Sequence, residues 1–274
     1  MPAPSTETTG PMGARTPTGP VVPEWDLAGA AGPTANLTGH QGLDDGSGGS
    51  PRVTPMQIGV LGATGPAGSG LAARLASVGF EVVIGSRSKY RSMEVRDTLL
   101  ERWEGRGLVI DAADNEGAAN ADLVVIATPW DAAAATAKSV SRQLQGKVVI
   151  SMANALAKVG HEFQPLVPPR GSVAASVQAA LPKSMVAAGF HHVPAKELGD
   201  LDHPVESDVL ICSDHPAATA AISEIIRKIP NMRPLDAGEL SNAAPIEAFA
   251  AVLLQLNVRY KTRAAVKFTG INED

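Results

Sequence analysis

A glycine-rich turn lies directly after a short apolar run near residue 60. It reads Gly62-Ala63-Thr64-Gly65-Pro66-Ala67-Gly68 and precedes apolar residues at helical spacing. In this setting Gly65 lets the backbone approach a phosphate, and Gly68 lets the helix pack closely against a sheet. The start of that helix offers free N–H groups and the positive end of its dipole. The turn therefore predicts a dinucleotide pyrophosphate site formed by Gly62, Thr64, Gly65, Pro66, Ala67 and Gly68.

About 20 residues later, a second apolar run ends in hydroxyl and basic side chains. The segment reads Gly85-Ser86-Arg87-Ser88-Lys89. A site for NAD would place an acid here to bind the ribose 2′-OH. Arg87 can instead meet a 2′-phosphate with its planar fork, Ser86 can donate to a phosphate oxygen, and Lys89 adds positive field. A carboxylate at position 85 would repel that phosphate, so the segment predicts NADP rather than NAD.

Two further segments follow apolar runs: the first should border the nicotinamide, and the second places two histidines at a strand end, where a functional role competes with a structural one. Thr128 and Pro129 come after the run 123–127, and ligands of open α/β sheets bind outside the carboxyl ends of strands. His191, His192 and Val193 come after the run 184–190. Adjacent side chains of an extended chain point to opposite sides, so at most one of the two histidines should face a given site.

Apolar runs alternate with helical patterns from residue 56 to about 150, which predicts a Rossmann-type parallel sheet. Gly79 should end the first helix, and Asp131 should cap the helix after the fourth strand. The expected strands lie at 57–62, 81–84, 108–110, 123–127 and 147–150. Beyond them we expect helices at 172–181, 216–228 and 243–260, and strands at 184–190, 208–212 and 264–268.

These patterns divide the chain into three parts. Residues 1–55 are crowded with Gly, Pro, Ser and Thr and predict a disordered tail, unless Met56 is the functional start. Residues 56–170 form the expected NADP-binding Rossmann domain. Residues 171–274 form a smaller C-terminal α/β domain on the substrate side, in which the apolar helix 243–260 also predicts a homodimer contact.

Composition excludes several classes of protein. The net charge is −5 and aromatic residues make up 4%, which argues against binding to nucleic acid. The chain has no apolar run of 18 residues and no signal-peptide pattern, so we expect no membrane span. One cysteine, Cys212, cannot form an intrachain disulfide, which fits the cytoplasm. We found no cluster with metal-ligand spacing and no nucleophile–base pair.

Five segments, in this order, make the chain resemble the NADPH-dependent F420 reductases. They cover the strand and turn 58–65, Ile84-Gly85-Ser86-Arg87, Thr128-Pro129-Trp130, residues 191–195 and residues 233–242. The resemblance extends over about residues 56–271. Ala63 stands where the family has its first glycine, and residues 151–156 replace a loop that often contains Pro-Leu.

The resemblance implies a direct hydride transfer between NADPH and the deazaflavin coenzyme F420. Thr64, Gly65, Ser86 and Arg87 would hold NADP, while His191 and Val193 would line the deazaflavin side. Such enzymes position two rings against each other, so no side-chain acid or base is required.

Other functions stay open from the residues alone. The turn Gly-Ala-Thr-Gly also occurs in short-chain dehydrogenases, but neither Tyr90 nor Tyr260 has the lysine four residues on that those enzymes use. An NADPH-dependent flavin or ferric reductase is a further alternative. A non-catalytic NADP sensor, which binds the nucleotide without oxidising it, is another.

Overall fold

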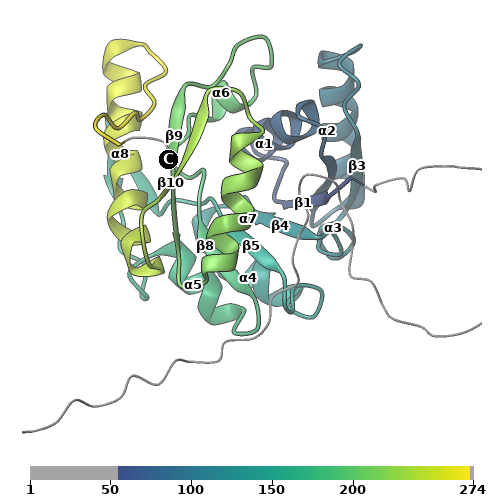
Figure 1. Ribbon diagram of the computed structural model, residues 1–274, viewed down its shortest axis with the longest axis horizontal. Coiled ribbons are helices and arrows are strands. Elements are labelled where there is room, and N and C mark those ends of the chain that lie inside the picture. The colour runs from purple at the N-terminus through teal and green to yellow at the C-terminus, as the bar shows by residue number, and fades with distance from the viewer. Residues whose placement is uncertain (1–54, 272–274) are drawn as a thin grey trace, which may run out of the picture.

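The computed structural model describes residues 55–271, and its centre is one eight-stranded sheet (Figure 1). The strand order is β10-β9-β8-β5-β4-β1-β2-β3. The strands from β3 to β8 pair in parallel, whereas β9 is antiparallel to β8 and parallel to β10. The strands are β1 (Gln57–Leu61), β2 (Glu81–Ser86), β3 (Ile110–Asp114), β4 (Leu123–Ile126), β5 (Val148–Ser151), β8 (Met185–Ala188), β9 (Ser207–Ser213) and β10 (Met232–Asp236).

The six parallel strands have the order of a doubly wound dinucleotide-binding sheet. This confirms the predicted Rossmann-type fold. The order reverses between β1 and β4, so the loops after these two strands diverge and leave a crevice at the carboxyl edge. The turn after β1 and the segment that begins at Ala127 therefore face each other across it.

Helices cover both faces of the sheet (Figure 1). One core contains Ile58 and Val60 of β1 together with apolar residues of α1, α2 and α7, and the other contains Leu61 with residues of α3, α4 and α5. Alternate strand residues thus enter opposite cores, as a sheet buried on both faces requires. The helices are α1 (Pro66–Ser77), α2 (Lys89–Arg102), α3 (Asn115–Ala118), α4 (Trp130–Ser139), α5 (Val173–Ala180), α6 (Ala195–Leu198), α7 (Pro216–Arg227) and α8 (Ala243–Tyr260).

The C-terminal part extends the same sheet. β8 pairs with β5, from Val148 opposite Met185 to Ser151 opposite Ala188, and β9 and β10 continue outward. α8 lies along the outer edge and packs on a small core with α5, β8 and β9 (Figure 1). The division at residue 170 remains a prediction. A separate hairpin of β6 (Leu156–Val159) and β7 (Glu162–Pro165) and a 3-10 turn, η1 (Leu240–Asn242), complete the described residues.

Several predicted elements differ from the structure. Residues 264–268 form no strand: Val266 accepts one backbone bond from Asp208 (2.7 Å), and then the Asp208 carboxylate, not a backbone carbonyl, receives the Phe268 N–H (2.6 Å). The third strand runs from Ile110 to Asp114 rather than over 108–110; its Asp111 is exposed, as a residue on an edge strand can be. Asp131 does not cap α4; Pro129 occupies that position and Asp131 lies in the first turn.

The ends of other elements follow the sequence pattern. Gly79 has a φ of +93° just beyond α1, the conformation that favours glycine after a helix. Ser172 caps α5 by accepting the Ala175 N–H (2.9 Å). The predicted tail, residues 1–55, lies outside the described residues except for Pro55. Within residues 55–271, no helix has both the length and the apolar character needed to cross a membrane.

Candidate functional site

The glycine turn joins β1 to α1 at the crevice, and two of its glycines are needed for close packing. Gly62 has a φ of +80°, and a Cβ there would lie 2.7 Å from the Thr128 nitrogen. A Cβ at Gly68 would lie 2.8 Å from the Cα of Ala63, so α1 packs directly on the turn. Gly65 is different, because only the Gly62 oxygen lies as near as 4.0 Å to its added Cβ. Open space therefore lies in front of the helix start, where a phosphate would approach.

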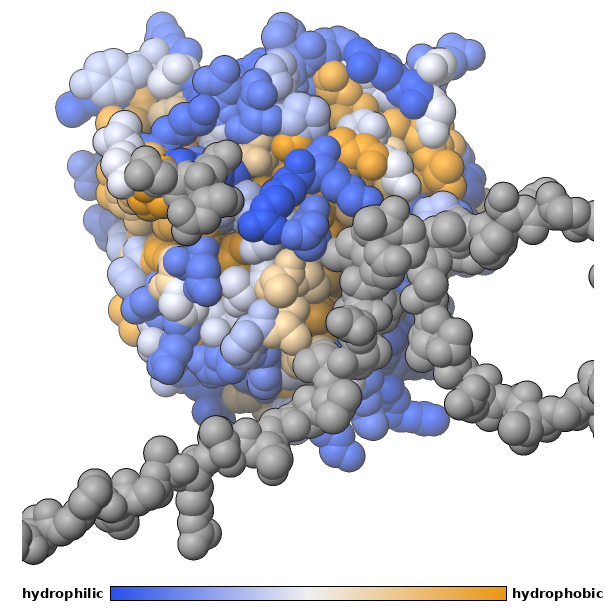
Figure 2. Space-filling view, viewed as in Figure 1, coloured by the Kyte–Doolittle hydropathy of each residue, from blue (hydrophilic) through white to orange (hydrophobic). Residues whose placement is uncertain are grey.

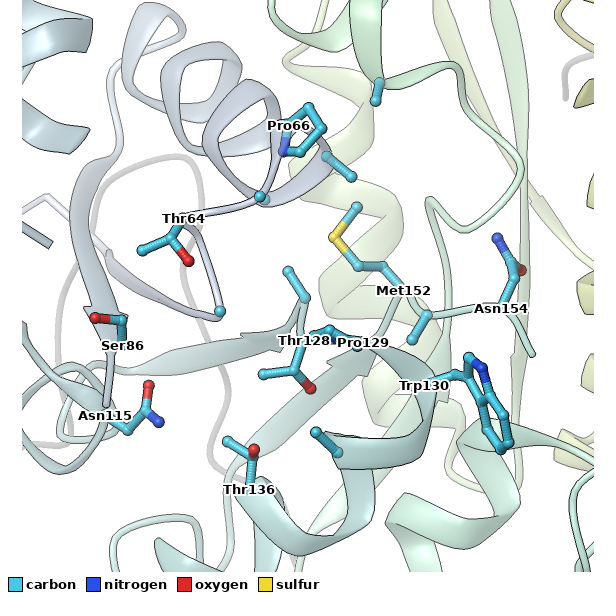
Figure 3. Close-up of a pocket in the computed structure, with 18 of the residues that line it drawn as sticks. Thr64, Pro66, Ser86, Asn115, Thr128, Pro129, Trp130, Thr136, Met152 and Asn154 are labelled. Atoms are coloured by element: carbon cyan, nitrogen blue, oxygen red, sulfur yellow. The ribbon is translucent and has the colours of Figure 1, made fainter. Parts of the chain in front are cut away.

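The turn forms one wall of a cavity of about 610 Å³ (Figure 3). Ser86 and Asn115 lie at one end of it, and Met152, Trp130 and Asn154 lie at the other, with Thr128 and Pro129 between them. All predicted nucleotide residues except Lys89 line this cavity: Gly62, Thr64, Gly65, Pro66, Ala67, Gly68, Ser86, Arg87, Thr128 and Pro129.

The end near β2 carries the predicted 2′-phosphate residues. Arg87 is exposed at the cavity, whereas Lys89 is exposed at the start of α2 and does not line it. The Ser86 hydroxyl is buried and donates to the Ser88 carbonyl (2.7 Å) while it accepts from Ser92 (3.0 Å). In this state Ser86 shapes the loop, and its proton is already donated within the protein.

The surroundings of Gly85 change the interpretation of the missing carboxylate at this position. A Cβ at this position would lie 2.7 Å from the Cβ of Ala118 and 2.9 Å from Cδ2 of Leu61. No side chain fits there without a shift in its neighbours. The absence of a carboxylate at Gly85 therefore has a packing cause of its own and does not by itself select NADP, so that selection depends on Arg87 and its surroundings.

A second cavity, of about 170 Å³, lies beside the first and shares four of its residues. These are Ala67, Met152, Asn154 and Ala195. The remaining wall consists of residues 190–194 and the inner side of α8. The two cavities thus meet at the carboxyl edge of β5, where Asn154 donates to the His191 carbonyl.

The two adjacent histidines occupy a turn rather than the extended chain that we expected. Phe190 has a φ of +60°, and its carbonyl accepts the Val193 N–H (3.1 Å). The rings of His191 and His192 lie 5.1 Å apart in an edge-to-face arrangement. The turn places both histidines at the same cavity, so the expectation that at most one of them would face a given site is wrong.

The histidines nevertheless differ in their partners. Nε2 of His192 lies 2.9 Å from the Asp208 carbonyl, so this ring joins the turn to β9. His191 is 5% exposed, and its ring nitrogens make no well-formed hydrogen bond among the described residues, although the nearby Gly189 backbone tends to raise its pKa. Burial, with a smaller effect from His192, lowers the pKa of His191 to about 3. His191 is therefore neutral at physiological pH and presents an uncharged ring to the cavity.

Sequence reasoning missed several lining residues. Asn115 follows β3, and Met152, Ala153 and Asn154 follow β5, so each lies at the carboxyl end of a parallel strand. The rule that selected Thr128 would have found them. Ala195 comes from a distant part of the chain, and the one sequence signal that includes it is the resemblance over residues 191–195. Among the described residues, no group of three or more His, Cys, Asp and Glu side chains could hold a metal ion.

The fold and the crevice define a dinucleotide-binding α/β protein. Comparison with known proteins makes this more specific. The family model for coenzyme F420-dependent NADP oxidoreductases matches residues 57–155. The F420-dependent NADP reductase of Methanocaldococcus jannaschii is 35% identical over 213 residues, which cover 76% of this chain and 95% of the relative. The enzyme of that name from Methanothermobacter marburgensis is 36% identical over 224 residues, covering 80% and 100%.

A solved structure supports the same assignment. It is a protein from Arthrobacter sp. FB24 assigned as an F420-dependent NADP-reductase, with a TM-score of 0.65 and 25% identity, and the match covers 76% of this chain and 96% of that one. The chain belongs to the F420-dependent NADP reductases. The family resemblance expected from the sequence is thereby confirmed.

Proposed function

We propose that this enzyme transfers a hydride directly between NADPH and coenzyme F420. The observation that carries the proposal is the pair of cavities that meet at Ala67, Met152, Asn154 and Ala195. The larger has the glycine turn, a helix N-terminus and Arg87, which suit a phosphorylated dinucleotide. The names of the two relatives described above supply the identity of the second substrate.

The second cavity fits one part of a flat ring system. Its volume is below the roughly 300–1,000 Å³ that is typical of ligand sites. A bound ring would therefore extend toward the shared wall, beside the larger cavity. The lining suits an aromatic ring, because Val193 and Leu253 are apolar and His191 is uncharged.

The reaction consumes NADPH, F420 and one proton and yields NADP⁺ and reduced F420. The nicotinamide C4–H bond breaks, a C–H bond forms at C5 of the deazaflavin, and the hydride carries both electrons. The protein contributes by binding the two substrates, orienting their rings against each other and excluding water from between them. We assign Thr64, Gly65 and Arg87 to NADP, with Ser86 lining that site and shaping the loop that carries Arg87, Thr128 and Pro129 to the nicotinamide end, and His191 and Val193 to the deazaflavin side.

We also propose that the enzyme is a homodimer. Four apolar side chains of α8 follow one another at helical spacing and remain exposed: Phe249, Val252, Leu256 and Tyr260. On the side of the molecule where α8 lies in Figure 1, Figure 2 shows apolar residues interspersed with polar ones. Core packing uses Leu253 instead, which is buried. A second copy would cover this stripe.

A cytoplasmic location belongs to the same proposal. Cys212, the one cysteine of the chain, is buried in β9, where desolvation raises its thiol pKa to about 11. A buried neutral thiol of this kind is unreactive and suits a reducing compartment. Fractionation of cells that express the native gene tests this: recovery with membranes or in the culture medium would contradict it.

One absorbance assay tests the proposed activity. Purified protein, NADPH and F420 should show loss of the deazaflavin absorbance together with oxidation of NADPH. NADH in place of NADPH, and FMN in place of F420, should give much slower reactions. Fast reduction of FMN or ferric complexes with none of F420 would favour the alternative reductases. Tight NADPH binding without oxidation by any acceptor would favour a sensor.

A further inference from the structure

Arg74 of α1 is a buried arginine that holds the loop beyond the second cavity. Its side chain is 4% exposed, and its guanidinium donates to four backbone carbonyls. The acceptors belong to Glu197 (2.9 Å), Leu198 (3.3 Å), His203 (3.1 Å) and Asp200. These carbonyls lie at the end of α6 and in the turn after it, where backbone acceptors have few partners within a helix. Arg74 therefore joins α6 to α1.

Gly70 brings the same two helices into backbone contact. It lies four residues before Arg74, on the same side of α1. A Cβ at Gly70 would lie 3.0 Å from the Ala195 oxygen and 3.0 Å from the Gly199 nitrogen. Any side chain here would push α6 away by a few tenths of an ångström. The glycine and the arginine thus act together, one permitting the close approach and the other holding it.

The joined helices lead to the two cavities. Ala67, one turn before Gly70, and Ala195, the first residue of α6, each line both cavities. α1 begins at the pyrophosphate turn, and α6 follows directly after the turn that contains His191 and Val193. A displacement of α6 along α1 would therefore change the separation between the two cavity walls.

We propose that Arg74 and Gly70 are positioning residues for hydride transfer, because they fix the wall formed by His191 and Val193 relative to the nucleotide cavity. The inference rests on the proposed function. Neither residue lines either cavity, so their effect reaches the reaction only through α6. Transfer between two bound rings is sensitive to such displacements, since a misplacement of about 1 Å can reduce a rate a hundredfold.

The test compares two variants with a matched control. Arg74→Lys retains the positive charge but has no planar fork and cannot serve all four carbonyls. Gly70→Ala adds one methyl group between the helices and provides a milder change if Arg74→Lys folds poorly. Arg227→Lys is the control, because Arg227 is an exposed arginine of α7 that pairs with Glu224 and lines neither cavity. Each protein is measured for its melting temperature, its NADP⁺ dissociation constant, kcat with F420, and the primary deuterium isotope effect with NADPH deuterated at the transferred position.

We expect both variants to bind NADP⁺ as the wild type does, while kcat falls by about ten- to a hundredfold. The isotope effect should rise, because hydride transfer becomes more fully rate-limiting. The control should be unchanged. A lower melting temperature with unchanged kcat and isotope effect would mean that the contact serves stability alone, and would overturn the inference. If the wild-type protein itself reduced no F420, the proposed function would fail first, and this inference with it.

Discussion

The nucleotide preference should depend on very few side chains at the carboxyl end of β2. Arg87 is the cation that lines the cavity there, and a charged hydrogen bond of this kind contributes about 1.5–3 kcal/mol. We expect Arg87→Ala to weaken NADPH binding by roughly ten- to a hundredfold and to leave NADH binding nearly unchanged. Titration calorimetry with both nucleotides measures this.

Lys89→Ala provides the control for that measurement. Lys89 is exposed and lies outside the cavity, so its charge attracts the 2′-phosphate only through solvent that screens it. Its removal should have a much smaller effect, and that effect should shrink further at high salt. Equal losses of NADPH affinity in the two variants would contradict the assignment of Arg87 to the 2′-phosphate.

Two glycines of the turn should give opposite results when each is changed to alanine. Gly65 has a φ of −89° and open space before it, so Gly65→Ala should fold normally but bind NADPH poorly, because the methyl group occupies the path of the phosphate. At Gly68 the added Cβ would meet the Cα of Ala63 at 2.8 Å, so Gly68→Ala should lose about 1–3 kcal/mol of stability. Urea unfolding and NADPH titration of both variants separate the two effects. A stable Gly68→Ala would show that α1 can shift without cost.

At the scale of elements, Glu247 connects α8 to the start of α5 in a pH-dependent way. Its buried carboxylate accepts the Val173 N–H (2.8 Å) and the Ala174 N–H (3.0 Å). Burial outweighs these bonds and raises its pKa from 4.5 to about 7. Because the folded state holds the proton more tightly, this contribution to stability is complete below about pH 4.5 and is lost as the pH rises through 7. It is on the order of 3 kcal/mol.

Glu247→Gln should remove that pH dependence, because the amide stays neutral and its oxygen can still accept one of the two N–H groups. We expect the wild type to lose more stability than the variant between pH 5 and pH 8, as measured by urea unfolding at both values. Glu224→Gln, on the exposed side of α7, should behave as the wild type. Parallel curves for wild type and Glu247→Gln would contradict the assignment.

Elements with strong local patterns could be predicted, and elements that depend on distant partners could not. β4 has four consecutive buried apolar residues, and the glycine turn has its strand, its helix and its spacing within a few residues. β10 contains Pro234, which disfavours a central strand, and the structure places β10 at the sheet edge, where proline is tolerated. Residues 264–268 have an apolar strand pattern, but the Phe268 N–H donates to the Asp208 carboxylate, whereas a β-ladder would require a backbone carbonyl as the acceptor.

The same distinction applies to the site. The nucleotide end could be predicted because its residues follow β1 and β2 within one continuous motif. The other end combines Met152 and Asn154 with Ala195 and α8, which are brought together only by the full sheet and by Arg74. The turn at His191 depends on a positive φ at Phe190. A phenylalanine rarely adopts this conformation, and the neighbouring residues contain no pattern that predicts it.

At the scale of the whole molecule, α8 has two apolar sides, of which one lines a cavity and the other is exposed. The inner side, with Ala250 and Leu253, lines the second cavity, while the outer stripe contains Val252, which is 50% exposed. A homodimer formed through the stripe would therefore support the wall of the second cavity from outside. Assembly and activity should then change together when the stripe is altered.

Val252→Asp tests this arrangement, because a carboxylate within an apolar interface is costly to bury. Light scattering should give twice the mass of one chain for the wild type and the mass of a single chain for the variant. Val258→Asp is the matched control: Val258 is 58% exposed on α8 but faces away from the stripe, and this variant should remain dimeric. We also expect Val252→Asp to lower kcat with F420 more than it lowers NADPH affinity, since α8 borders only the second cavity. A monomeric wild type would contradict the dimer, whereas a dimer that survives in both variants would place the interface elsewhere on the surface.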